Sequence, residues 1–180
     1  MQNGNRTWVT YDSSKVPDYW VTSIFCDNKD NLWIGTHNWG IAVKHSNDEW
    51  ERWYTNNCPI INNYIRTFAQ APSGDIWVGF GTSVVSGGEL SYFNGTTWQN
   101  SFVIPSTSQT AAILINKDNT KLIATDQGLI KFSSSSNVIN FNFDNTGVNI
   151  NNVTGLARDS KGNIWISTSG GGLVEYKNAQ

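Results

Sequence analysis

A polar turn followed by a short apolar strand recurs four times along this 180-residue sequence. One strand position holds leucine in the third copy and tryptophan in the other three. The four residues are Trp33, Trp77, Leu122 and Trp165, which are 44, 45 and 43 residues apart. A nearly constant period of this length indicates a repeat architecture, in which each unit buries its apolar face against its neighbours.

The turn before each of these strands has its own signature at its fourth position. The residues there are Asp30, Gly74, Asn119 and Gly162. Gly, Asn and Asp tolerate a left-handed backbone at low cost, and a tight hairpin turn needs that tolerance at such a position. A calcium-binding loop is the alternative, but the alternating oxygen ligands ending in Glu are missing. We therefore predict a tight turn in every copy.

The repeats are predicted to be blades of a β-propeller. Each contains short runs rich in β-branched and aromatic residues, broken by Gly, Asn and Pro, and helix signals are almost missing. The last repeat stops one strand short, whereas residues 6–11 precede the first repeat and resemble a fourth strand. We predict one all-β domain over residues 1–180, with four four-stranded antiparallel blades per chain. The blades are expected at about 21–54, 65–102, 110–143 and 153–176, the last completed by residues 6–11.

Pairing of residues 6–11 beside residues 172–176 would close a ring and remove open sheet edges. Two arrangements satisfy this pairing: a four-bladed ring within one chain, and an eight-bladed ring made by a homodimer. Closure within one chain needs no partner. Crowding at a narrow axis, where Thr22, Arg66 and Arg158 are expected, favours the two-chain ring.

A residue repeated at one strand position usually packs between units, so Trp33, Trp77 and Trp165 are predicted to be core residues. Residues 121–123 should still form a second strand in the third repeat, because the turn residue and the flanking apolar runs are retained. Leu122 fills less volume than tryptophan, so this blade should pack less well.

Composition and charge restrict the class of partner. The net charge of -2 offers no basic surface for nucleic acid. No apolar run reaches membrane-spanning length, and no signal peptide opens the chain. A low charged fraction with many Asn, Ser, Thr, Gly and Trp residues is typical of secreted or periplasmic β-proteins. Of the two cysteines, Cys26 is predicted to be a buried small hydrophobe, and a disulfide with Cys58 is disfavoured because the two are expected toward opposite faces.

Three motifs recur in or between the repeats: residues 16–24, Leu-Trp-Ile-Gly-Thr at 32–36, and residues 92–98 with two Gly-Leu pairs. They resemble the opening, the middle and the end, in that order, of the two-component regulator propeller repeat family. The third repeat departs by lacking the tryptophan and the Gly-Thr pair, and the second inserts residues 81–88. The resemblance implies the periplasmic or extracellular part of a sensor, for which glycan fragments are typical signals.

A ligand site is expected on the rim where chain segments enter the first strands and leave the second strands, because loops on a rigid scaffold commonly carry binding residues. The candidates are Trp20, Tyr64, Gln109 and Asn152, directly before the first strands, with His37, Trp39 and Asp126 after the second strands. Aromatic faces beside amides suit an oligosaccharide or another small polar ligand. The alternative is that Trp20 and Tyr64 only plug the channel.

Catalytic signals are weak. Neither His37 nor His45 has metal-ligand spacing to a second ligand, and no nucleophile elbow, phosphate loop or Cys/His constellation is found. We therefore predict no catalytic residue, no metal and no cofactor. Streptogramin lyases are similar in repeat pattern and use a rim histidine with metal-binding carboxylates, so an enzyme would need His37 with Asp126 or Glu89. The main alternative to a ligand-binding sensory module is a protein-interaction or assembly propeller.

Overall fold

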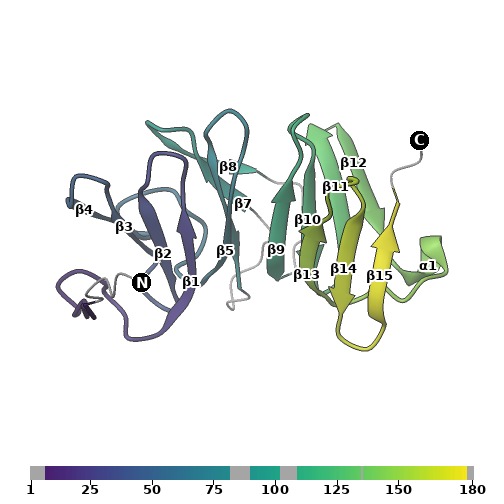
Figure 1. The fold of residues 1–180 in the computed structure, drawn as a ribbon, viewed down its shortest axis with the longest axis horizontal. Helices are drawn as coiled ribbons and strands as arrows, with labels where there is room; N and C mark the ends of the chain where they lie inside the picture. The colour runs from purple at the N-terminus through teal and green to yellow at the C-terminus, as the bar shows by residue number, and fades with distance from the viewer. Residues whose placement is uncertain (1–6, 82–89, 102–108, 135, 178–180) are drawn as a thin grey trace, which may run out of the picture.

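A computed structural model describes residues 7–81, 90–101, 109–134 and 136–177. Within them the chain forms four antiparallel sheets, here called blades 1 to 4, each built from strands that follow one another in sequence (Figure 1). Blade 1 holds β1 (Val21–Cys26), β2 (Leu32–Thr36), β3 (Ile41–Lys44) and β4 (Trp50–Trp53). Blade 2 holds β5 (Ile65–Gln70), β6 (Ile76–Phe80), β7 (Leu90–Phe93) and β8 (Trp98–Ser101). Blade 3 holds β9 (Thr110–Ile115), β10 (Lys121–Thr125), β11 (Gly128–Ser134) and β12 (Asn137–Phe141), followed by the short helix α1 (Phe143–Thr146). Blade 4 holds β13 (Val153–Arg158), β14 (Ile164–Thr168) and β15 (Gly172–Tyr176).

The tight turns between first and second strands are confirmed in all four blades. The φ angles at the fourth turn position are 61° at Asp30, 97° at Gly74, 66° at Asn119 and 88° at Gly162. All four are in the left-handed region, which only Gly, Asn and Asp adopt at low cost. The local sequence therefore selects the hairpin that begins each blade.

The tryptophan of the repeat packs between blades, as predicted, in blades 1 and 2. Trp165 of blade 4 is only half-buried, because no further blade packs on it, so the prediction of a core residue was wrong there. Trp33 is 4% exposed, and its ring centroid lies 6.3 Å from those of Phe68 and Trp98 in blade 2. Trp77 is 6% exposed and makes an edge contact with Phe132 of blade 3, with ring centroids 5.9 Å apart. These contacts join blade 1 to blade 2 and blade 2 to blade 3 through aromatic side chains.

The third repeat forms its second strand despite the missing tryptophan. β10 pairs with β9 and β11 along its whole length, so the prediction for residues 121–123 is confirmed. Leu122 is 1% exposed and lies in the core between blades 3 and 4. Lys121 next to it is nearly buried, with Nζ 4.7 Å from the ring centroid of Trp77. Burial lowers the pKa of Lys121, an effect that the charge of Asp75 partly offsets.

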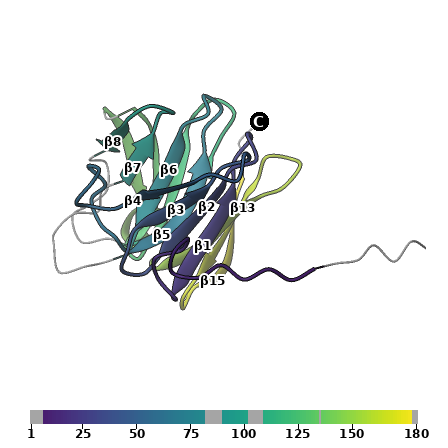
Figure 2. The same ribbon diagram turned by 90° about the vertical axis from the view of Figure 1, so that its left-hand side faces the viewer.

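The four blades are arranged as an open half-ring. Their inner strands contact one another in order, β1 with β5, β5 with β9 and β9 with β13. Blades 1 and 4 extend in opposite directions from these inner strands (Figure 1). Figure 2 shows β1, β13 and β15 along one side of the molecule and β7 and β8 on the other. One face of blade 1 and one face of blade 4 are thus directed toward the same open side.

The outer strand predicted at residues 6–11 is not formed in the described part of this segment. Residues 7–11 have no strand pairing, and β13, β14 and β15 make a three-stranded sheet. The Tyr11 ring instead packs on Trp50 of blade 1, 5.2 Å between centroids, and Arg52 donates a 3.0 Å hydrogen bond to the carbonyl oxygen of Ser13. The physical reason is the half-ring, which places blade 4 at the opposite end of the molecule from these contacts. In the part of the chain that the structure describes, no strand pairing closes a four-bladed ring.

Both cysteines are free, and they differ in burial. Cys58 is buried, and burial raises the pKa of its thiol. Cys26 is exposed, so the prediction that it is a buried small hydrophobe was wrong. It is the last residue of β1, where that strand reaches the polar turn.

Candidate functional site

The rim residues lie where first strands begin and second strands end. Backbone hydrogen bonds connect the loop that leads into a first strand with the loop that follows a second strand. In blade 1 the amide of His37 donates to the carbonyl oxygen of Trp20, 3.1 Å. In blade 2 the amide of Gly81 donates to the carbonyl oxygen of Tyr64, 2.9 Å. In blade 4 the amide of Ser169 donates to the carbonyl oxygen of Asn152, 2.9 Å, so the same link fixes the residue before the first strand in blades 1, 2 and 4.

The aromatic half of the rim is a stack of three rings. The Trp20 and His37 rings are nearly parallel, 10° apart, with centroids separated by 4.4 Å. The Tyr64 ring lies 4.3 Å from His37 on a 42° tilt. Trp20 is 63% exposed, whereas Tyr64 is half-buried. The stack therefore brings together three residues predicted from the sequence and leaves an aromatic face open to solvent.

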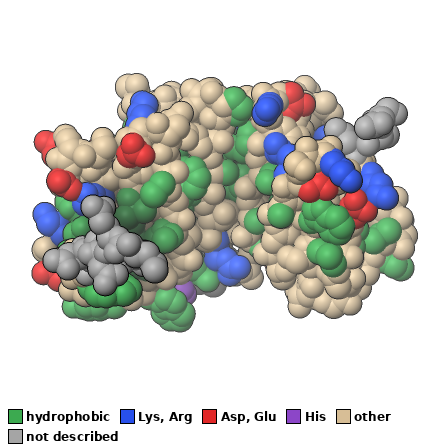
Figure 3. Space-filling model, in the orientation of Figure 1, with side chains coloured by type: hydrophobic (Ala, Val, Ile, Leu, Met, Phe, Trp, Pro, Cys, Tyr) green, Lys and Arg blue, Asp and Glu red, His purple; other side chains and the backbone are tan. Residues whose placement is uncertain are grey.

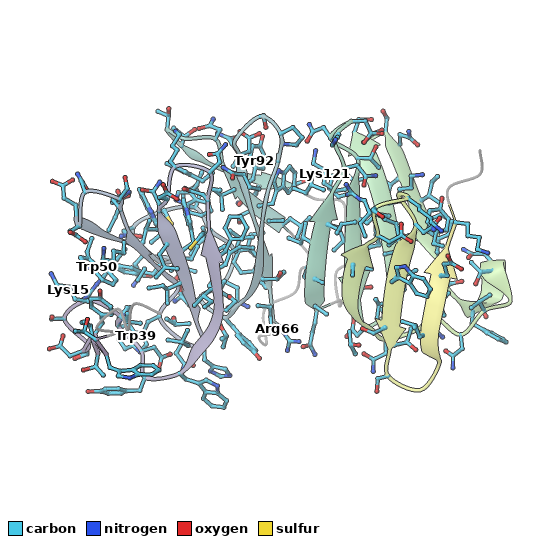
Figure 4. The ribbon with its side chains drawn as sticks, viewed as in Figure 1. Lys15, Trp39, Trp50, Arg66, Tyr92 and Lys121 are labelled. Atoms are coloured by element: carbon cyan, nitrogen blue, oxygen red, sulfur yellow. The ribbon has the colours of Figure 1, made fainter. Side chains whose placement is uncertain are left out.

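Asp18 positions the exposed end of this stack. Its carboxylate accepts hydrogen bonds from the amides of Trp20, 3.0 Å, and Asn38, 2.9 Å. Burial would raise the pKa of Asp18, but these amide bonds outweigh it and hold the pKa below its usual value. The fixed loop also presents Trp39, which is 58% exposed and lies at the lower edge of the molecule (Figure 4). The exposed ring faces that a binding platform requires are thus present on Trp20 and Trp39.

The polar half of the rim lies across blades 2, 3 and 4. A small cleft of about 100 Å³ is lined in part by Arg66, Gln109, Asp126 and Asn152. The Asp126 carboxylate accepts a 3.1 Å hydrogen bond from the amide of Gln109, and its carbonyl oxygen accepts one of 3.1 Å from the amide of Asn152. Three sequence-predicted residues are therefore brought together in this cleft, separately from the aromatic stack.

Arg66 joins the two halves and was missed as a site residue by the sequence reasoning. Its guanidinium carbon lies 5.9 Å from the ring centroid of Tyr64, and the same side chain lines the polar cleft (Figure 4). The corresponding inner-strand residues of the other blades are Thr22, Ala111 and Thr154. Arg66 is the one charged residue among these four equivalent positions, and this difference is the sequence signal that could have identified it.

The described residues hold no group of three or more His, Cys, Asp or Glu side chains placed to share a metal ion. His37 is packed between the rings of Trp20 and Tyr64, and its Nδ1 lies 3.0 Å from the Asn38 side-chain oxygen. Glu89, the second carboxylate considered for a lyase-like site, lies outside the described residues. The geometry supports stacking and hydrogen bonding at the rim.

Comparison with a family sequence model finds the two component regulator propeller at residues 15–38 and 147–170. This agrees with the resemblance noted in the sequence. No curated protein matches the sequence significantly. No helix in the described part of the chain is long and apolar enough to cross a membrane.

Solved structures with the same fold include extracellular domains of bacterial regulators. One is that of the putative one component system BT4673 from B. thetaiotaomicron, with a TM-score of 0.75 and 17% identity over 96% of this chain and 24% of that one. Another is that of the putative hybrid two component system BT3049 from B. thetaiotaomicron, with a TM-score of 0.66 and 23% identity over 87% of this chain and 23% of that one. The chain thus spans about a quarter of the length of these structures.

A similar fold is also found in an enzyme. The virginiamycin B lyase from Staphylococcus aureus, solved with quinupristin, has a TM-score of 0.64 and 13% identity over 89% of this chain and 56% of that one. At such identities these likenesses show the fold, a β-propeller arrangement of blades.

Proposed function

We propose that this chain, two stretches of which are two-component regulator propeller repeats, is a non-enzymatic ligand-binding module of a periplasmic or extracellular sensor. Its ligand is a small, neutral, polar molecule of the oligosaccharide class, bound at the rim. Solved structures of similar fold that are extracellular domains of regulator systems support this location and role.

The observation that carries the proposal is the open stack of Trp20, His37 and Tyr64 beside Arg66. An exposed indole face accepts the apolar C–H face of a sugar ring, while arginine, amide and carboxylate groups bind hydroxyls. The polar cleft with Gln109 is too small, at about 100 Å³, to enclose a sugar, so it would bind only one end of the ligand. The stack distinguishes this proposal from a simple channel plug, because a plug has no need of an exposed Trp20 face.

The test is isothermal titration of the chain with a panel of neutral tri- and tetrasaccharides, followed by alanine variants. Trp20→Ala should weaken binding about fivefold, since one stacked aromatic ring contributes about 1 kcal/mol. Phe143→Ala removes another exposed aromatic ring, 51% exposed on α1, and should leave binding unchanged. If the panel does not bind, or if both variants bind like the wild type, the rim is not the site.

We further propose that a second copy of the chain completes the ring, as an eight-bladed homodimer. The half-ring supports this assembly, because two such arcs related by a two-fold axis close a circle. Hydrophobic side chains are exposed on the open side over both blade 1 and blade 4 (Figure 3). A closed ring would also remove the unpaired edges of the terminal blades.

Equivalent positions in the repeat predict how the copies would meet. Trp33 packs on Phe68 of the next blade, and the position of Phe68 in blade 1 is taken by Ile24, which is 70% exposed. Trp165 of blade 4 occupies the place of Trp33 but is only half-buried. Trp165 of one copy would therefore pack on Ile24 of the other. The two-fold axis repeats this contact, so it would occur twice in the ring.

The N-terminal segment supplies the second contact. Trp8 is 98% exposed and Val9 67% exposed, and β15, which would receive them as an outer strand, carries Leu173 with 66% exposure. Residues 6–11 of one copy would thus complete blade 4 of the other.

Light scattering coupled to size exclusion tests the assembly directly, because one chain has a mass of 20.0 kDa and the ring twice that mass. Ile24→Asp should give single chains, whereas Ile139→Asp, at a 44% exposed position on β12, should leave the dimer intact. A 20.0 kDa particle at the highest soluble concentration, or a dimer unaffected by Ile24→Asp, would contradict the proposal.

A further inference from the structure

Tyr64, directly before the first strand of blade 2, has a rim neighbour from each of two blades. From blade 1, the His37 ring lies 4.3 Å from the Tyr64 ring, between centroids. From blade 2, Gly81 lies under the same ring, because a Cβ at that glycine would be 2.2 Å from a Tyr64 ring carbon. His37 and Gly81 are equivalent positions, since each directly follows the second strand of its blade.

A contact of the same kind is found between blades 3 and 4. The carbonyl oxygen of Asp126, directly after β10, accepts a 3.1 Å hydrogen bond from the amide of Asn152, directly before β13. At both of these junctions the residue that follows a second strand touches the residue that precedes the next first strand.

Trp20 has only one of these two neighbours. His37 of its own blade covers one face of the indole, whereas no blade precedes blade 1 in the described chain, and Trp20 is 63% exposed. Because His37 lies between Trp20 and Tyr64, the open indole face is directed away from blade 2. It is therefore also directed away from the polar cleft across blades 2, 3 and 4 of the same chain.

In the two-copy ring the missing neighbour of Trp20 is Ser169 of the second copy. Blade 4 of that copy precedes blade 1, and Ser169 directly follows β14. The amide of Ser169 donates a 2.9 Å hydrogen bond to the carbonyl oxygen of Asn152, so these two residues approach Trp20 together. Both are exposed, and their hydroxyl and amide groups can bind sugar hydroxyls.

The junction between the copies has room that the junction between blades 1 and 2 lacks. In the latter, the His37 ring fills the space beside Tyr64. Ser169 has no ring, and Gly170 and Gly171 follow it. Trp20 therefore keeps an uncovered indole face when the copies meet, and a sugar ring can lie on Trp20 where the histidine ring lies on Tyr64.

Given the proposed function of the rim and the two-copy ring, on which this inference rests, we propose that the saccharide site is shared between the two copies. Trp20 of one copy stacks on the sugar ring, and Asn152 and Ser169 of the other bind its hydroxyls. The polar cleft with Arg66 continues the site beyond Asn152. The two-fold axis produces two such sites in each assembly.

Saccharide binding and assembly are then linked. A saccharide that touches both copies binds the two-copy ring more tightly than the single chain. It must therefore favour assembly by the same factor at each site. A module built in this way converts the presence of its ligand into a change of assembly.

Titration calorimetry with cellotetraose, xylotetraose and maltotetraose, comparing the wild type with Ile24→Asp, tests the shared site. Ile24→Asp should give single chains and leaves Trp20 in place. The tetrasaccharide that binds the wild type most tightly should bind these single chains at least about tenfold more weakly. The reason is that the single chain lacks the two hydrogen-bonding side chains of the second copy, each worth about fivefold. Light scattering should show the same tetrasaccharide shifting dilute wild-type chain from 20.0 kDa toward twice that mass.

A mixture of two defective variants separates a shared site from a site within one chain. Trp20→Ala removes the stacking face, and Asn152→Gly removes the amide without strain, because φ at Asn152 is 55°. Each variant alone should bind the tetrasaccharide weakly. In a one-to-one mixture half of the assemblies are mixed, and each mixed assembly has one intact junction, so about a quarter of all junctions should regain wild-type affinity. The same mixture in the Ile24→Asp background is the control and should regain none.

The shared site is overturned if the single chains bind the tetrasaccharide as tightly as the wild type, or if the mixture regains no affinity. In either case a saccharide site within one chain would still stand. If none of the three tetrasaccharides binds the wild-type chain, the proposed function fails together with the shared site.

Discussion

Asp27 is expected to stabilise blade 1 through one carboxylate that accepts four hydrogen bonds. The donors are the amides of Lys29, 2.8 Å, and Asn31, 2.9 Å, the side-chain amide of Asn31, 2.9 Å, and the indole Nε1–H of Trp33, 2.9 Å. Both Asp27 and Trp33 are buried. The carboxylate therefore connects the tight turn to the aromatic core between blades 1 and 2.

Asp27→Asn is the sharpest perturbation, because it keeps the shape and one acceptor oxygen. The NH₂ of the new amide replaces one carboxylate oxygen and therefore faces two of the four existing donors. In one orientation the buried Trp33 Nε1–H has no acceptor, and in the other the turn amides have none. A hydrogen bond to a charged group contributes about 1.5–3 kcal/mol, and a buried unpaired donor costs about 1–3 kcal/mol. We expect a loss of about 3 kcal/mol in the free energy of unfolding near neutral pH.

The effect should depend on pH with a definite sign. Burial alone would raise the pKa of Asp27, but the hydrogen bonds from Trp33 and Asn31 outweigh it and hold the pKa below its ordinary value of 3.8. Since the folded-state pKa is lowered, the stabilisation is fully present above the pKa of the unfolded chain and is lost as pH falls through the folded-state value. The difference between wild type and Asp27→Asn should therefore shrink below about pH 4.

Urea unfolding followed by tryptophan fluorescence, at a series of pH values, measures this difference. Asp159→Asn is the matched control, because Asp159 makes the same turn and accepts from Trp165 at 3.3 Å but lies on the open blade 4. It should lose less stability. A loss under about 0.5 kcal/mol for Asp27→Asn, or one that does not change with pH, would refute the reasoning.

Two further substitutions test the packing of blade 3. A Cβ at Gly128, where φ is 129°, would lie 2.2 Å from the carbonyl oxygen of Phe141 on the fourth strand, so Gly128→Ala should cost about 3 kcal/mol or more in urea unfolding. The equivalent Gly172 in blade 4, with φ of 76°, meets no described atom within 4 Å in the single chain. In the Ile24→Asp background, in which no second copy completes blade 4, Gly172→Ala should therefore cost only about 1–2 kcal/mol, and a loss equal to that of Gly128→Ala would contradict the fourth-strand contact. Lys121→Met removes a nearly buried charge and should stabilise the chain by about 1 kcal/mol near neutral pH. Because burial lowers the pKa of Lys121, this gain should decrease as pH rises toward the ordinary lysine value of 10.5, and a loss of stability at neutral pH would show that the charge over Trp77 is favourable.

Local chemistry was sufficient to predict the strands and turns. Residues such as Gly74 and Asn119 permit the left-handed turn wherever they occur, and alternating apolar residues form a strand in any blade. For this reason even the third repeat, with Leu122 in place of tryptophan, was predicted as a strand and is one. The period of the repeat also predicted that Trp33 and Trp77 lie between blades, because equivalent positions of a repeat face the next unit in the same way.

The candidate site was predicted in part. The loops that carry Trp20, His37 and Tyr64 could be assigned to one rim from topology alone, but their stacking order depends on side-chain positions across two blades. Arg66 was overlooked because its strand position is an inner one in every blade, and only the fold shows that its long side chain reaches the rim.

The curvature of the whole arc was decided only by the tertiary structure. Residues 6–11 have the sequence of an outer strand, and sequence alone cannot say which sheet edge they reach. The angle between successive blades depends on the volumes packed between them, such as the rings of Trp33, Phe93 and Trp98, and small differences add up over four blades. That sum yields a half-ring, so blade 4 lies far from Tyr11, which packs on Trp50 instead. Strand identity is a local property of the chain, whereas closure is a global one that each interface between blades helps to set.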